Sequence, residues 1–112
     1  MKRVLPNCKK AYVPEEKLSN YLLSETHAIG KAKARYFQSI GYTLKNSAKL
    51  VDALIMIANS ESVSQEITTV FGTKYIIDGK LDTPIGTTVQ LRTVWVIDAK
   101  DDRPRFITAY PA

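Results

Sequence analysis

The 112-residue sequence is poor in the residues that cross-link small proteins or bind metals, because it contains one cysteine and one histidine. A single thiol, Cys8, excludes an internal disulfide and any zinc cluster built on cysteines. His27 stands alone and outside any H-E-x-x-H spacing, so we expect neither a metal site nor a cofactor. A nucleophilic Cys8 is the weaker interpretation, since a free thiol in a polar stretch is most often incidental.

Long apolar runs are absent as well. No stretch of the sequence approaches the roughly 20 apolar residues needed to cross a bilayer. The opening residues, MKRVLPNCKK, are basic but lack the apolar segment of a secretory signal, so we expect a cytoplasmic protein that does not engage a membrane. Repeats, low-complexity segments and linkers are also missing, and one domain over residues 1–112 is expected.

The charge of the chain is its first positive feature. Sixteen Lys and Arg residues against eleven Asp and Glu residues leave a net charge of +5. Such an excess favours a polyanionic partner such as RNA, because each phosphate contact releases condensed counterions. Charge alone does not establish this partner, since many basic proteins bind no nucleic acid.

Helical periodicity fills the first half of the sequence. Gly41 is placed as the C-terminal stop of the second helix, and Asn46 or Ser47 can cap the start of the third. The predicted helices lie within residues 12–25, 30–42 and 46–60.

After about residue 60 the pattern changes to that of strands. Asp78–Gly79 is interpreted as a turn, as are the segments DTPIGTT and AKDDRP. Helices followed by an antiparallel meander predict an α+β domain in which three N-terminal helices pack on one face of a four-stranded sheet. The predicted strands lie within residues 62–72, 73–81, 88–98 and 105–111.

Alternation along the third predicted strand separates two sets of side chains. Leu91, Thr93 and Trp95 share one face with Val89 and Ile97, which is the expected contact with the helices. Arg92 therefore projects from the opposite, open face.

The last predicted strand is ambiguous, because alternation does not decide which of its two sets faces the helices. If Ile107 and Ala109 point inward, Thr108 and Tyr110 stand beside Arg92 on the open face. The same alternation places Lys74 of the second strand on that face.

Those open-face residues suggest chemistry directed at phosphate. Two cations, Lys74 and Arg92, could hold a phosphate, the hydroxyl of Thr108 could donate to it, and the phenol of Tyr110 could stack on a base or donate a proton. The simpler interpretation is that Lys and Arg keep an exposed face soluble, while Thr and Tyr are favoured in strands.

His27 adds a group that can exchange protons at neutral pH. It precedes the basic residues Lys31, Lys33 and Arg35, and nearby cations favour the neutral imidazole that can act as a base. The alternative is a loop histidine that caps a helix or binds nothing.

Four blocks carry a resemblance to a known family: H-x-x-G-x-x-K-A from His27, G-x-K-Y from Gly72, R-T-V-W from Arg92 and T-A-Y-P from Thr108. Together with their flanking residues they resemble a family of small, largely uncharacterised bacterial domains. That family is found next to small antitoxin genes and at the C-termini of polymorphic toxins. More distantly, helices followed by a four-stranded meander ending in T-A-Y-P are similar to the barnase/RelE/colicin group of metal-independent ribonucleases.

The resemblance to that ribonuclease group implies a metal-independent endoribonuclease and assigns roles to its residues. His27 would act as base or acid, Arg92 would stabilise the charged transition state, and Tyr110 would stack or donate a proton. Thr108 would orient the phosphate, whereas Thr93 matches the motif but is expected in the core. The residues expected to bind RNA phosphates are Lys31, Lys33, Arg35 and Lys74.

Two functions stay open at this point. The first is the toxin of a toxin–antitoxin pair that cleaves RNA by 2′-hydroxyl attack to a 2′,3′-cyclic phosphate. The alternative is a non-catalytic RNA- or protein-binding module. The partners expected are RNA and a small acidic antitoxin, and the sequence leaves open whether the chain forms a homodimer.

Overall fold

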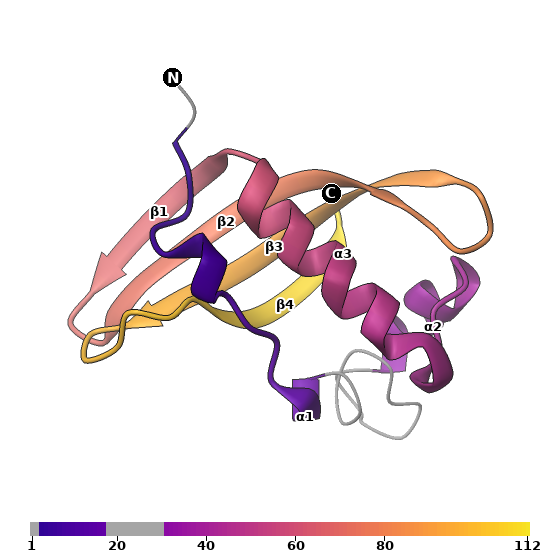
Figure 1. The fold of residues 1–112 in the computed structure, drawn as a ribbon, viewed down its shortest axis with the longest axis horizontal. Coiled ribbons are helices and arrows are strands. Elements are labelled where there is room, and N and C mark those ends of the chain that lie inside the picture. Colours follow the sequence, from indigo (N-terminus) through magenta and orange to yellow (C-terminus); the bar gives the residue numbers. More distant parts are fainter. Residues whose placement is uncertain (1–2, 18–30) are drawn as a thin grey trace.

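Four strands form one antiparallel sheet in the order β1-β2-β3-β4 in this computed structural model, which describes residues 3–17 and 31–112 (Figure 1). Each strand pairs with the next in the chain, so the α+β class and the four-stranded meander are confirmed. The strands are β1 (Val63–Thr69), β2 (Gly72–Asp82), β3 (Thr88–Asp98) and β4 (Arg105–Pro111).

Only one of the described helices runs across the sheet, which corrects the prediction that three helices pack on one face. Figure 1 shows α3 crossing the sheet diagonally, whereas α2 lies beyond its end, near the start of α3 and the β2–β3 hairpin. Helix α1 is described for one turn, and the remainder of the first predicted helix lies outside the described residues. The helical elements are η1 (Cys8–Lys10), α1 (Glu15–Lys17), α2 (Lys31–Ser39), η3 (Leu44–Asn46) and α3 (Ser47–Ser60).

The end of α2 agrees with the signal in the sequence, whereas the start of α3 has no side-chain cap. Helix α2 ends at Ser39, and Gly41 follows with a φ of 102°, a left-handed conformation in which glycine is unstrained. Asn46 is the residue before α3, but its side-chain oxygen accepts from the Thr43 backbone N–H at 2.7 Å and closes a capping box on η3. Within the described segments, no helix combines the length and apolar character needed to span a membrane.

The core lies between α3 and the face of the sheet that it crosses. Apolar residues at helical spacing on α3, including Leu54 and Ile57, are buried against inward-facing strand residues. Trp95 is fully buried at the centre, and its ring meets that of Phe106 edge to face at 5.4 Å between centroids. This packing occupies one face of the sheet, and no helix of the described residues packs across the other face.

Thr93 is a polar residue inside this core, as predicted. Its side chain is fully buried and makes two hydrogen bonds, donating from Oγ1 to the Ile77 carbonyl at 2.8 Å and accepting from Trp95 Nε1 at 2.9 Å. The hydroxyl therefore satisfies the indole N–H of the largest core residue.

Replacing Thr93 with valine should destabilise the fold by about 1–3 kcal/mol, because the isosteric side chain leaves the buried indole N–H without an acceptor. Thr93→Ser keeps the hydroxyl and is expected to cost less than Thr93→Val. Urea unfolding followed by the fluorescence of the single tryptophan measures both variants. Equal stability of the valine variant and the wild type would contradict this role.

Asp78–Gly79 does not form a turn, and the interpretation of this dipeptide from the sequence is wrong. Both residues lie inside β2, opposite Arg92 and Leu91 of β3. A Cβ atom added at Gly79 would lie 2.9 Å from Cγ2 of Ile57, so glycine here lets α3 approach the strand closely. Tertiary packing, and not turn chemistry, accounts for the glycine.

A β-bulge decides which residues of β4 face the core. The register between β3 and β4 shifts next to Trp95, so that Trp95 faces Phe106 while Val94 faces Thr108. The bulge inserts Ile107 between them, which turns Phe106 inward and Thr108 outward although both have the same parity in the sequence. Ala109 is also fully buried, so Tyr110 lies on the open side.

Candidate functional site on the open sheet face

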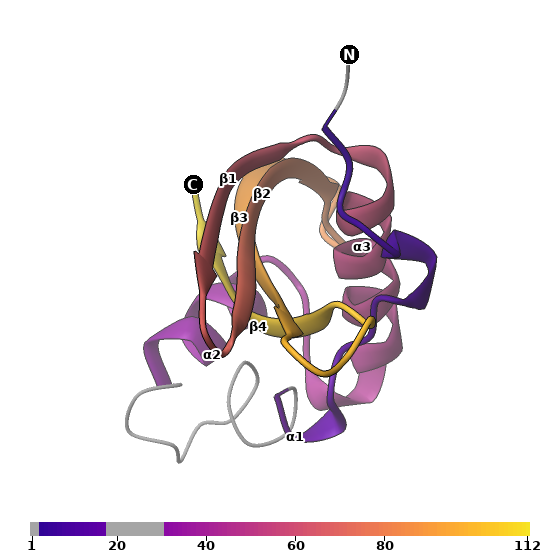
Figure 2. The ribbon, with the colours of Figure 1, turned by 90° about the vertical axis from the view of Figure 1, so that its left-hand side faces the viewer.

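The open face is the side of the sheet turned away from α3, which Figure 2 shows on the side of the strands opposite to that helix. Strands β2, β3 and β4 contribute to it. We call three residues that lie directly opposite one another on these strands a row, and the side chains of one row project to the same face. The rows that matter are Lys74–Val96–Arg105, Ile76–Val94–Thr108 and Asp78–Arg92–Tyr110.

Arg92 is the central charged residue of the open face. Its Nε donates to Asp78 Oδ1 at 2.8 Å and its Nη2 donates to Asp78 Oδ2 at 2.9 Å, which is a two-pronged ion pair. The Arg92 side chain is 42% exposed and that of Asp78 is 24% exposed. The guanidinium is therefore held in one orientation at a surface that solvent reaches, and its remaining N–H groups are not taken by Asp78.

Asp78 was not identified as a site residue from the sequence. Its pairing with Arg92 follows from the register of β2 on β3. The available signal was the alternation of β2, in which Asp78 shares a face with Lys74 and Ile76. That signal was masked by the strong turn preference of Asp-Gly.

The electrostatics keep Arg92 charged. Hydrogen bonding to Asp78, and then the negative charge of that carboxylate, raise the pKa of Arg92 above its ordinary value. Desolvation acts in the opposite direction, and the charge of Tyr110 and its hydrogen bond raise this pKa further. Arg92 is consequently a permanent cation in contact with both an anion and a phenol.

Tyr110 and Thr108 lie on the open face, which is one of the two arrangements that the sequence left open. Tyr110 is directly opposite Arg92 on the neighbouring strand, and Thr108 is one row away, opposite Val94. Both side chains are half-buried. The structure thus brings Arg92, Thr108 and Tyr110 together on one face.

Lys74 is on the same face of the sheet as Arg92 but in a different row. It is exposed and lies two rows from Asp78, which is about 13 Å along the strand at roughly 3.3 Å per residue. The structure therefore places Lys74 two rows from the Arg92 row.

The remaining predicted residues come from the segment that includes α2. Arg35 is exposed on this helix. Lys31 and Lys33 belong to the same helix, but their side chains lie outside the described part, as does His27. Among the residues that the structure describes, no group of three or more His, Cys, Asp or Glu side chains could hold a metal ion.

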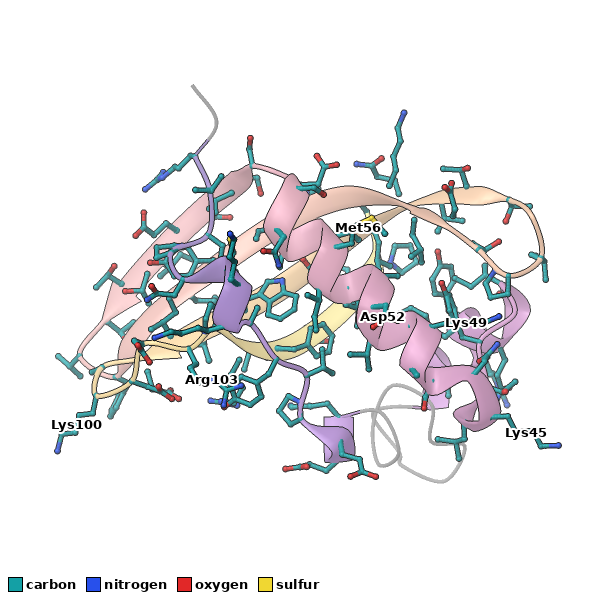
Figure 3. All side chains as sticks on the ribbon, viewed as in Figure 1. Lys45, Lys49, Asp52, Met56, Lys100 and Arg103 are labelled. Atoms are coloured by element: carbon teal, nitrogen blue, oxygen red, sulfur yellow. The ribbon has the colours of Figure 1, made fainter. Side chains whose placement is uncertain are left out.

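Away from the open face, a hollow of about 340 Å³ lies between α3 and the β2–β3 hairpin. Figure 3 shows Lys49, Asp52 and Met56 along the exposed side of α3 that borders it. Asp82 also lines the hollow, and burial followed by the charge of Asp82 raises the pKa of Tyr42 beside it. Two carboxylates against one lysine make this hollow a poor phosphate site.

The fold and the open face define a small α+β domain in which a four-stranded meander carries an arginine and a tyrosine on the face turned away from α3. By its sequence, the chain belongs to the family DUF6883, a domain of unknown function, which it matches over residues 4–112. The expectation of an uncharacterised family is confirmed. No curated protein matches the sequence.

The fold is similar to that of a solved structure. It is a chain of a contact-dependent growth inhibition toxin–immunity protein complex from Klebsiella pneumoniae 342, with a TM-score of 0.72 and 18% sequence identity. The similarity covers 93% of this chain and 95% of that chain. At this identity the likeness concerns the fold.

Proposed function

We propose that this chain is a toxin domain that cleaves RNA without a metal ion. The observation that carries the proposal is the row Asp78–Arg92–Tyr110, in which a fixed, permanently charged guanidinium lies beside a phenol on a solvent-reachable face. Preorganised donors at the position of developing charge are the main requirement for a reaction that passes through a more negatively charged phosphorane-like state.

The proposed reaction is a transesterification within one RNA strand. A base removes the 2′-hydroxyl proton, the 2′-oxygen bonds to the adjacent phosphorus, and the bond from phosphorus to the 5′-oxygen breaks as that oxygen takes a proton. The products are a 2′,3′-cyclic phosphate and a free 5′-hydroxyl. Arg92 would stabilise the charged phosphate oxygens and Thr108 would orient them.

Two groups are needed to move the protons. His27 is the proposed base or acid, on the strength of its chemistry and its basic neighbours in the sequence. Because the chain has one histidine, the second role falls to Tyr110 or a lysine. We assign it to Tyr110, because this residue lies opposite Arg92 on the neighbouring strand.

The toxin role is supported by the fold of the neighbour described as part of a toxin–immunity protein complex. A toxin of this kind needs a protein that neutralises it in the cell that makes it. With a net charge of +5, the present chain suits an acidic neutralising partner. The proposal therefore includes RNA as substrate and an acidic protein as partner.

A non-catalytic binding module is the second candidate, and the Arg92–Asp78 pair is the observation that favours it. The carboxylate offsets the positive charge that would attract a phosphate, as expected for a pair with a structural role. This candidate predicts salt-sensitive binding of RNA or protein without cleavage.

Incubation of the purified chain with a defined single-stranded RNA in EDTA separates the two candidates. The toxin proposal predicts cleavage that EDTA leaves unchanged, with fragments ending in a 2′,3′-cyclic phosphate and beginning with a 5′-hydroxyl. Mass spectrometry of the fragments identifies both ends. Intact RNA at enzyme concentrations that bind it would favour the non-catalytic module, and 5′-phosphate products would overturn the mechanism.

A further inference from the structure

The two edge strands of the sheet, β1 and β4, differ in how far other parts of the chain form hydrogen bonds with their outer edges. The outer edge of β4 is partly covered by the N-terminal segment, since Phe106 N–H donates to the Tyr12 carbonyl and Tyr12 N–H to the Pro104 carbonyl, both at 3.0 Å. On β1 the Val63 N–H donates to the Arg3 carbonyl at 2.7 Å. From residue 64 to residue 69, β1 makes no backbone hydrogen bond to a described residue outside β2.

This free edge lacks the usual protection of edge strands. Every residue of β1 after Val63 is exposed, and the strand contains neither lysine nor proline. Its one charged residue, Glu66, forms an ion pair with Arg3 and so presents little repulsion to an incoming strand. Edges of this kind are templates for pairing with another chain.

Next to the free edge is a concentration of exposed apolar side chains. Val70 and Phe71 form the turn between β1 and β2 and are 85% and 81% exposed, and Ile67 is 37% exposed. Polar residues and glycine are the usual occupants of such turns, so a valine–phenylalanine tip needs an explanation. A hollow of about 260 Å³ opens beside it, lined by Ile67, Phe71, Gly72, Lys74, Val96 and Asp98 among others.

Two lysines near the tip could each bind a carboxylate of a partner, although Asp101 lies beside one of them on the same turn. Lys74 borders the hollow, and Lys100 lies on the β3–β4 turn, which meets the tip through a hydrogen bond from Ala99 N–H to the Phe71 carbonyl at 2.9 Å. Figure 3 shows Lys100 projecting from that end of the molecule. Neither lysine forms an ion pair with a described residue, whereas the carboxylate of the hollow, Asp98, is paired with Arg105 at 3.5 Å.

We propose that the free edge of β1 and the Val70–Phe71 tip form one docking surface for an acidic protein, which adds an extended segment to the sheet as a fifth strand. The edge supplies backbone hydrogen bonds, the hollow takes an apolar side chain, and Lys74 and Lys100 take carboxylates. A lipid surface is less suitable, because hydrocarbon cannot satisfy the backbone groups of the edge.

The identity of this partner rests on the proposed function, since a toxin needs a neutralising protein. The docking surface involves no residue of the Arg92 row, although at Gln65, which pairs with Ile76, the edge comes within one row of it. A partner seated there would exclude RNA from the open face by its bulk, not by occupying the guanidinium.

A synthetic ten-residue peptide of alternating valine and glutamate, blocked at both ends, is the probe. Titrated into the ¹⁵N-labelled protein, it should shift the backbone amide signals of residues 65–71 and slow hydrogen exchange along β1. The same peptide N-methylated at alternate residues cannot pair with a strand edge and should not bind. The experiment uses no RNA, so it can fail or succeed independently of the nuclease proposal.

Variants test the side-chain contacts. Phe71→Ser should weaken the affinity about tenfold, and Lys74→Glu or Lys100→Glu by up to about fivefold each. Lys80→Glu, on the same strand but outside the hollow, and Met56→Ser, at an exposed apolar position of α3, are the matched controls and should leave the affinity unchanged.

Four results would overturn the proposal: no amide shifts at millimolar peptide, shifts confined to other elements, equal binding of the N-methylated peptide, or amide shifts of β1 that depend on protein concentration without peptide. The last would assign the edge to a second copy of this chain. Binding of phosphatidylglycerol vesicles that Phe71→Ser abolishes, with no peptide binding, would assign the tip to a membrane.

Discussion

Arg92→Ala is expected to lower the rate of RNA cleavage by about 100- to 1,000-fold, the effect of removing one preorganised donor from a site of developing charge. Arg92 is held by Asp78 in a two-pronged pair, so its geometry is set before the substrate arrives. Single-turnover cleavage in EDTA measures the chemical step. Arg92→Lys retains the charge but not the planar fork, and we expect it to recover only part of the rate.

Arg105→Ala is the matched control for this experiment. Arg105 is also on the open face of the sheet and also in an ion pair, with Asp98, but it lies two rows from Arg92. Both variants lose one positive charge, so general attraction for RNA falls equally in each. Equal rates for the Arg92 and Arg105 variants would remove Arg92 from the proposed site.

Trp95→Ala is expected to lower the free energy of unfolding by about 3–5 kcal/mol, the usual cost of emptying a site occupied by a large aromatic side chain. The ring is fully buried, packs edge to face on Phe106 and donates its N–H to Thr93. Its removal therefore takes a contact from both Phe106 and Thr93. In a domain of this size such a loss is a large part of the total stability.

Trp95→Phe is the control that keeps an aromatic ring in the core. It keeps a ring against Phe106 but removes the indole N–H, so it should cost less than the alanine variant. Urea unfolding followed by circular dichroism gives the free energies, because the variants lack the tryptophan fluorophore. A loss below about 1 kcal/mol for Trp95→Ala would show that the core can collapse around the missing ring.

Local patterns in the sequence were sufficient for the order and type of α2, α3 and the four strands, but they did not predict the short helices η1 and η3. β-branched residues and alternation placed the four strands close to their observed bounds, and Gly41 marked the end of α2. Alternation along β3 also placed Arg92 on the face of the sheet that Trp95 does not occupy, because neighbouring side chains of a strand project to opposite faces. These features depend on residues a few positions apart.

The same patterns failed where a distant contact overrides local preference. Asp78–Gly79 has strong turn chemistry, yet the approach of Ile57 from α3 and the pairing of Asp78 with Arg92 keep it inside β2. The packing of three helices on one face was wrong for a similar reason, since the placement of α2 depends on contacts such as that of Gly41 with Pro84.

The sequence by itself determined that this chain is basic, that it folds as helices followed by a meander, and that Arg92 faces away from the core. Only the tertiary structure decided that Asp78 orients Arg92, that the bulge at Ile107 turns Thr108 and Tyr110 to the same side, and that Lys74 lies apart from them. Register and bulges are set by pairing between strands, which no stretch of a single strand encodes.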